Sequence, residues 1–99
     1  MAEVGPKLDR FLHAIAHPTR RRILRALKEK GGASIPKETG LCAFDIEQRV
    51  KLAQPTISHH MRILVKAKLV EAKREGHWRW YLRDEKLIAE MVRELRRQL

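Results

Sequence analysis

Residues 54–64 read Gln-Pro-Thr-Ile-Ser-His-His-Met-Arg-Ile-Leu, and the fold of the chain is best inferred outward from this stretch. Ile57, Met61 and Leu64 recur at helical spacing, so they predict the apolar face of a helix over about 54–66. The opposite face and the N-terminal end carry side chains suited to base edges and phosphates, namely Gln54, Thr56, Ser58, His59, Arg62 and Lys66. An ordinary amphipathic helix with a solvated polar face explains this stretch equally well, so the flanking segments must decide.

Residues 69–83 have the pattern of a β-hairpin. Two arms rich in β-branched or aromatic residues flank a turn at Gly76, and the second arm alternates Trp78, Trp80 and Leu82 with more polar residues. A basic hairpin after a polar-faced helix is the arrangement of a winged helix-turn-helix, in which the helix enters the major groove and the wing straddles the backbone. The expected wing contacts are Arg74, His77 and Arg79.

The segments upstream supply the support for such a reading helix. Residues 44–50 form a short helical pattern, and Ala53 stands where a stronger Ser or Thr cap is expected, a deficit of about 1 kcal/mol. Pro18 begins another helix, which buries its apolar positions. The predicted fold is mainly α with a small β-hairpin (α+β): a winged helix-turn-helix of about five helices and a two-stranded wing.

Three motifs, in this order and spacing, resemble the signatures of the ArsR/SmtB family. They are His17-Pro18-Thr19-Arg20-Arg21-Arg22-Ile23-Leu24, Gln54-Pro55-Thr56-Ile57-Ser58-His59-His60 and Arg74-Glu75-Gly76-His77-Trp78. The resemblance covers roughly residues 8–98. It implies a small homodimeric winged-helix repressor of the kind found in bacteria and archaea, which binds a palindromic operator and is released by a signal. Family members differ in that signal, so the resemblance does not identify it.

Composition favours a nucleic-acid partner independently of this resemblance. The 99 residues predict one domain over 1–99, with a formal net charge of +10. Residues 49–83 hold nine Lys or Arg against two acidic residues, and this basic block covers the expected reader and wing. The alternative is a generally basic, solvated surface. We expect double-stranded DNA as the partner.

Cysteine content and hydropathy indicate the compartment. The single cysteine excludes an intrachain disulfide and fits a reducing cytoplasm. No apolar run approaches the roughly 20 residues needed to span a bilayer, and no signal-peptide core follows the N-terminus, so we expect a cytoplasmic protein with no membrane partner. Residues 30–40 are rich in turn formers and should be the least ordered stretch, with no role assigned.

Two apolar stripes near the termini predict a dimer interface. They lie on helices expected over about 7–16 and 84–98 and consist of Leu8, Phe11, Leu12, Ile15, Leu87, Ile88, Met91, Val92, Leu95 and Leu99. In the resembled family these helices pair across a two-fold axis, which presents two reading helices about one DNA turn apart. The alternative is that both stripes fold back onto their own domain.

The family's metal sites are largely missing from this chain. Cys42 matches the first thiol of one family site, but Phe44 and Glu47 stand in the places of the other two. A lone thiolate is a poor site for a soft metal or arsenical. At the second site Asp84 is present, but Lys86 follows and no histidine occurs after residue 77. We therefore expect no metal and no cofactor.

The histidines offer little in their place. His13 and His17 have chelating spacing on a helix, yet Pro18 directly after His17 favours a turn or cap for that residue. His59 and His60 are adjacent, so they point about 100° apart on a helix. His59 is the expected DNA contact, and His60 is expected to pack against a neighbouring helix.

Cys42 is also a candidate redox switch, because a helix N-terminus and nearby cations favour the thiolate. The alternative is a small hydrophobe at the start of a helix. Enzyme activity is not expected, and no catalytic residue is assigned, because no base lies near Cys42 in sequence and no phosphate-binding Gly loop or carboxylate pair appears.

Three classes of function stay open at this point. The first is a DNA-binding repressor with a ligand or thiol switch, and the second is an autorepressor or architectural regulator without a small-molecule switch. The third is a winged-helix module that contacts RNA or protein, which the polar and basic reading helix disfavours.

Overall fold

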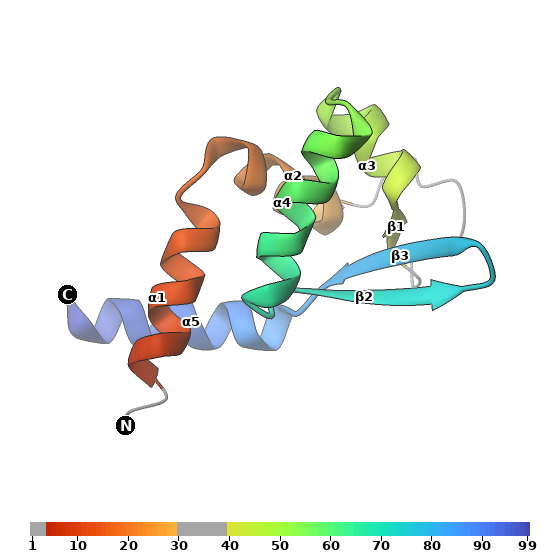
Figure 1. Ribbon diagram of the computed structural model, residues 1–99. Helices are drawn as coiled ribbons and strands as arrows, with labels where there is room; N and C mark the ends of the chain where they lie inside the picture. The colour runs from red at the N-terminus through yellow and green to blue at the C-terminus, as the bar shows by residue number, and fades with distance from the viewer. Residues whose placement is uncertain (1–3, 30–39) are drawn as a thin grey trace.

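The computed structural model describes residues 4–29 and 40–99, so the expectation for the 30–40 connection falls outside it except at Gly40. Within these residues, eight elements follow one another (Figure 1). They are α1 (Val4–Ile15), α2 (Pro18–Glu29), β1 (Leu41–Cys42), α3 (Ala43–Val50), α4 (Gln54–Lys66), β2 (Val70–Glu75), β3 (Trp78–Arg83) and α5 (Glu85–Gln98). The five helices and the hairpin have the winged helix-turn-helix arrangement that the sequence predicts.

The helices gather at one end, and the β2–β3 hairpin projects from them (Figure 1). α5 runs back from the hairpin and packs against α1, so the two terminal helices cross and are in contact. The core lies between the helices and the base of the hairpin, and its largest fully buried side chains include Ile23, Leu27, Ile57, Leu64 and Leu69. No helix within the described ranges combines the length and apolar character that crossing a bilayer requires.

A third strand extends the expected two-stranded wing. β1 pairs with β3, so the sheet order is β1-β3-β2 with both pairings antiparallel. Gly40 makes this approach feasible, because its φ is +83° and a Cβ there would collide with the Tyr81 carbonyl oxygen. A two-residue strand gives too little alternation to be recognised in a sequence.

The central position of β3 also explains a departure from its sequence alternation. Trp80 and Tyr81 are adjacent and point to opposite faces, yet both are buried. Trp78, nearer the tip, stays 57% exposed.

Arg83, which belongs to the basic block predicted from the sequence, turns inward. It donates a hydrogen bond to the Leu24 carbonyl oxygen at 3.1 Å and forms an ion pair with Glu85 at 2.9 Å. The cationic surface is therefore smaller than the charge count suggests.

The helix-turn-helix is formed by α3 and α4. Lys51 ends α3 in the left-handed conformation, with φ 56°, and its N–H donates to the Glu47 carbonyl oxygen. Ala53 is the N-cap of α4 and makes no side-chain cap hydrogen bond, which confirms the weak cap expected at this position. Asp84 caps α5 more strongly, since its carboxylate accepts a hydrogen bond from the Leu87 N–H at 3.0 Å.

Candidate nucleic-acid interface

The α4 helix has one buried and one exposed face. Ile57, His60, Met61 and Leu64 are buried, and they hold the helix against the body of the protein. The six polar residues expected to contact DNA lie outside this buried set. Gln54, Thr56, His59, Arg62 and Lys66 are exposed, and Ser58 is partly exposed. The helix therefore offers a continuous polar face.

Two of these residues are joined to each other. The Gln54 side-chain amide donates a hydrogen bond to the Ser58 hydroxyl oxygen, 2.6 Å away. The spacing is four residues, so the two side chains lie one turn apart on the same face. Among the described residues the Gln54 amide oxygen and its second amide hydrogen make no other bond, and the bond to Ser58 holds the side chain along the helix surface.

The wing places two arginines opposite one another. Arg74 on β2 and Arg79 on β3 are register partners, and both are exposed. Like charges directly opposite on a sheet repel, so this pairing favours an anion between or beside them. His77 is exposed in the turn that joins the two strands, next to Gly76 with φ +60°. All three expected wing contacts are thus accessible.

The reading helix and the wing together enclose a groove of 420 Å³. It is lined by Ser58, Met61, Arg62, Val65, Lys66, Ala72, Arg79 and Tyr81. Four of the residues expected to contact DNA, from two elements, thus meet around one groove. Three of these four are cationic, so the groove is suited to a phosphate backbone.

The histidines separate into two environments. His59 is exposed, whereas His60 is only 6% exposed and its ring centroid lies 5.2 Å from that of His59 and 4.7 Å from that of His17. His17 accepts a hydrogen bond from the Thr19 N–H at 3.1 Å, which confirms its expected role as a turn or cap residue. Burial lowers the pKa of His60, and the charges of His17, Arg20 and His59 lower it further.

The terminal stripes divide between core and surface. Leu8, Phe11 and Met91 are buried within the chain itself, so these three behave as the fold-back alternative predicts. Leu12, Val92 and Leu99 are 36%, 52% and 96% exposed. Four expected residues are partly buried against the core: Ile15, Leu87, Ile88 and Leu95. The terminal helices therefore carry apolar surface beyond what their own domain covers.

Cys42 lies at the junction of β1 and α3. It is 1% exposed, and its thiol donates a hydrogen bond to the Asp45 carboxylate at 3.3 Å. Phe44, in the place of a second thiol in the resembled metal site, is 57% exposed. Among the described residues, no group of three or more His, Cys, Asp or Glu side chains is arranged to hold a metal ion. An oxidant would reach this thiol only after a local opening of the structure.

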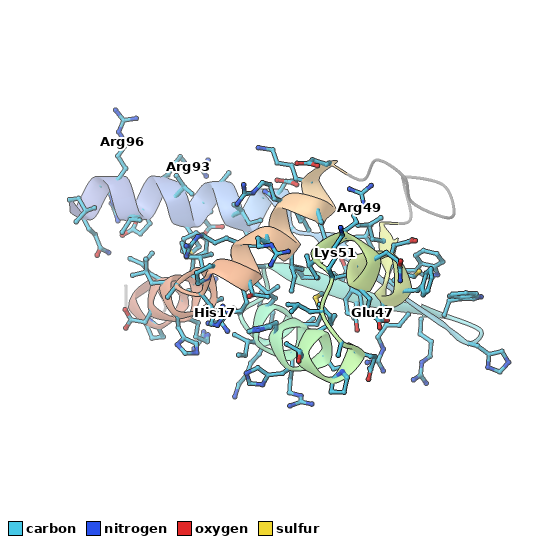
Figure 2. The ribbon with its side chains drawn as sticks, turned by 90° about the horizontal axis from the view of Figure 1, so that it is seen from above. His17, Glu47, Arg49, Lys51, Arg93 and Arg96 are labelled. Carbon is cyan, nitrogen blue, oxygen red and sulfur yellow. The ribbon has the colours of Figure 1, made fainter. Side chains whose placement is uncertain are left out.

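Sequence reasoning missed two cationic positions. Lys51 is exposed in the turn before α4 (Figure 2), where a phosphate could be contacted. Arg20 is 6% exposed and bonded to His60 of the reading helix, with its Nη1 3.2 Å from His60 Nδ1. A signal for Arg20 existed, because it precedes Ile23 and Leu27 at the spacing of the buried face of α2.

Comparison with known proteins gives consistent matches. The family model described as "Bacterial regulatory protein, arsR family" matches residues 17–72. An uncharacterized HTH-type transcriptional regulator of Methanocaldococcus jannaschii is 36% identical over 87 residues, covering 88% of this chain and 89% of the relative. The transcriptional repressor SdpR of Bacillus subtilis is 35% identical over 74 residues, covering 75% and 72%.

Solved structures show the same fold. A crystal structure of an ArsR family transcriptional regulator aligns with a TM-score of 0.73 at 21% identity, covering 93% of this chain and 91% of that one. A possible transcriptional regulator for arsenical resistance aligns with a TM-score of 0.69 at 27% identity, covering 88% and 80%.

Proposed function

The chain belongs to the arsR family of bacterial regulatory proteins, which are DNA-binding transcriptional regulators and not enzymes, and from that premise we propose that it is a homodimeric repressor of a palindromic operator. In this proposal residues 1–99 act as one DNA-binding domain. α4 reads base edges, the β2–β3 wing grips the backbone, and α1 and α5 form the two-fold interface.

The groove between α4 and the wing is the observation that carries this proposal. Ser58, Arg62 and Lys66 from the helix and Arg79 from the wing all line it. A major groove admits one helix, and a flanking basic hairpin then lies against the adjacent phosphates. Cations thus lie on both sides of the groove, and this suits a polyanion that contacts α4 and the wing at once.

The dimer is supported by the apolar surface on the terminal helices. Leu12 and Val92 are exposed on α1 and α5, two elements that pack against each other. Burying such side chains against a second copy stabilises the dimer by about 25 cal/mol for each Å² of apolar area removed from water. A two-fold dimer would place its two reading helices about one DNA turn apart, which matches the two half-sites of an inverted repeat.

The test combines selection of DNA with a mass measurement. Light scattering after size exclusion should give about twice 11.6 kDa for the free protein. Selection from a random duplex pool, followed by gel shifts, should return an inverted repeat, and the region upstream of the chain's own reading frame is the first natural candidate. A monomer, or a pool without enrichment, would contradict the proposal.

Two of the open modes of control can be separated by one experiment. One is regulation by abundance or by a partner, with no small-molecule switch, and the other is a thiol switch at Cys42. The buried thiol, bonded to Asp45, favours the first. Adding peroxide to the protein–DNA complex distinguishes them, since release that is lost in Cys42→Ser would establish the thiol switch.

A further inference from the structure

Arg20 is a buried cation whose partners in the described structure are all uncharged. It is 6% exposed, and the ion pairs within residues 4–29 and 40–99 involve Arg83 and Arg97 instead. Its Nε donates to the Ala14 carbonyl oxygen at 2.6 Å, and its Nη2 donates to the His13 carbonyl oxygen at 3.0 Å. These carbonyls belong to the last turn of α1, where backbone oxygens lack intrahelical partners and carry partial negative charge.

The remaining arm of the same guanidinium reaches the reading helix. Arg20 Nη1 lies 3.2 Å from His60 Nδ1, in the middle of α4. A guanidinium has only donors, so His60 Nδ1 accepts and the ring proton sits on Nε2. One rigid, planar group on α2 therefore binds the C-terminal end of α1 and the centre of α4 together.

This link joins the two elements whose relative position matters most in the proposed dimer. α1 lies at the proposed two-fold interface, and α4 enters the groove. The distance between the two copies of α4, and hence the separation of the half-sites, depends on how each α4 is held relative to its own α1. Larger packing contacts of α1 are with α2 and α5, so the guanidinium adds a directional connection to α4.

We propose that Arg20 is a positioning residue that fixes α4 relative to α1 and thereby sets the half-site spacing that the dimer accepts. The inference rests on the proposed function, because it needs a dimer on a two-part site. Arg20 itself faces the protein interior, so its effect on DNA is exerted through His60. The neighbouring His59 is exposed on the same helix and is the group expected to meet the DNA.

The chain supplies a matched control at the next position. Arg21 Nη1 donates to the Ile15 carbonyl oxygen at 2.6 Å, so it binds the same end of α1. Its side chain is exposed, and its bond does not involve α4. Arg21→Gln therefore removes a cation from the α1 terminus and leaves the connection to α4 intact. Comparing it with Arg20→Gln separates the connection from general support of α1.

His60 supplies a second pair of variants. The side-chain oxygen of His60→Asn can accept from Arg20 near the position of Nδ1, whereas His60→Leu removes the acceptor. Neither change touches the guanidinium, so this pair tests the link where Arg20→Gln fails to fold. Thermal unfolding and light scattering identify the variants that remain folded dimers.

The experiment measures dissociation constants on three duplexes and one half-site. The wild type first selects its preferred duplex, and the spacing is then changed by one base pair in each direction. We expect such a change to weaken the wild type, Arg21→Gln and His60→Asn by about tenfold, comparable to one mismatched base pair. In Arg20→Gln and His60→Leu the ratio between the dissociation constants for the altered and the preferred spacing should shrink to about threefold or less. Their affinity for the isolated half-site should stay within about twofold of the wild type.

The contrary result is equally definite. If Arg20→Gln and His60→Leu weaken binding by the same factor at every spacing, then the residue supports the fold without positioning the reader, and the inference is wrong. Failure of the proposed function would look different. The wild type itself would then select no duplex or remain monomeric, which would overturn both.

Discussion

Arg74 and Arg79 face each other across the hairpin, at paired positions of β2 and β3, and both are exposed. Like charges directly opposite on a sheet destabilise it by roughly 0.2–1 kcal/mol. The free protein therefore bears a small cost at the element proposed to grip DNA. A phosphate beside the pair would neutralise this repulsion.

We therefore expect Arg79→Gln to have opposite effects on folding and on binding. The free energy of unfolding should rise by a few tenths of a kcal/mol, because the repulsion from Arg74 is removed. Affinity for specific and random DNA should fall alike, and the slope of log K against log salt should decrease by about 2, one phosphate contact for each wing of the dimer. Urea unfolding and binding at two salt concentrations measure both quantities.

Arg93→Gln is the control for this charge change. Arg93 projects from α5 on the side of the molecule away from α4 (Figure 2), so its loss should leave the salt slope nearly unchanged. If the salt slope decreases equally in Arg79→Gln and Arg93→Gln, then net charge, and not the wing, determines binding.

The pH dependence of stability should report His60. Burial lowers the pKa of this histidine below its ordinary value of 6.5, and electrostatic interactions with His17, Arg20 and His59 act in the same direction. The unfolded chain then binds more protons than the native one below that value. This contribution to stability is fully present above pH 6.5 and is lost as the pH falls through 6.5 toward the native pKa, with a slope of at most about 1.4 kcal/mol per pH unit.

His60→Asn removes this titration and keeps an acceptor for Arg20. Urea unfolding of both proteins between about pH 7.5 and about pH 5 should show wild-type stability falling more steeply. Parallel curves would show that protonation of His60 does not limit stability in acid.

The proposed interface is tested at a side chain that the domain leaves uncovered. Val92→Arg places a charge on the 52% exposed position of α5, where the free monomer tolerates it but a two-fold interface does not. Light scattering should shift toward the monomer mass of 11.6 kDa, and specific DNA binding should weaken with it. Arg93→Gln on the same helix should remain dimeric. A Val92→Arg protein that stays dimeric would move the interface away from this face.

Metals and arsenite should not release the DNA. The chain has one cysteine, Cys42, and it is buried and bonded to Asp45, while Phe44 stands exposed in the place of a second thiol. Soft metals and arsenicals require several sulfur ligands. A gel shift with stoichiometric Zn, Cd or arsenite should retain the complex. Release by one equivalent that disappears in Cys42→Ser would overturn this account of the site.

The sequence was sufficient to predict an element where its local pattern agrees with the burial of its side chains in the structure. The α4 positions Ile57, Met61 and Leu64 recur at helical spacing and are buried, so both the helix and its polar face could be predicted. The same holds for the wing, whose Arg74 and Arg79 are exposed as their alternation indicates.

Long-range contacts determine the features that local pattern could not supply. Strand β1 exists because Gly40 lets the chain approach β3, and Arg83 turns inward because the Leu24 carbonyl oxygen and Glu85 are available to it. Helical spacing places Arg20 on the buried face of α2, but its partner cannot be found from local pattern, because the contact is 40 residues away at His60.

The last prediction separates reading of sequence from affinity for the backbone. Gln54 and His59 lie on the exposed face of α4, in its N-terminal half, and glutamine can pair with adenine through two hydrogen bonds worth roughly 1–3 kcal/mol against a wrong base. Gln54→Ala or His59→Ala should therefore lower the ratio of specific to random affinity and leave the salt slope nearly intact.

The Gln54–Ser58 hydrogen bond makes this prediction sharper. At 2.6 Å it holds the glutamine amide along the helix, so Ser58→Ala should release the side chain and lose part of the same discrimination while Gln54 is still present. In Gln54→Ala the further change Ser58→Ala should then cost less than it does alone, which a double-mutant cycle on one selected duplex measures. Additive losses would show that the two side chains act independently. If the helix variants lower the affinity for specific and for random DNA equally, then α4 binds phosphates and the bases are read elsewhere.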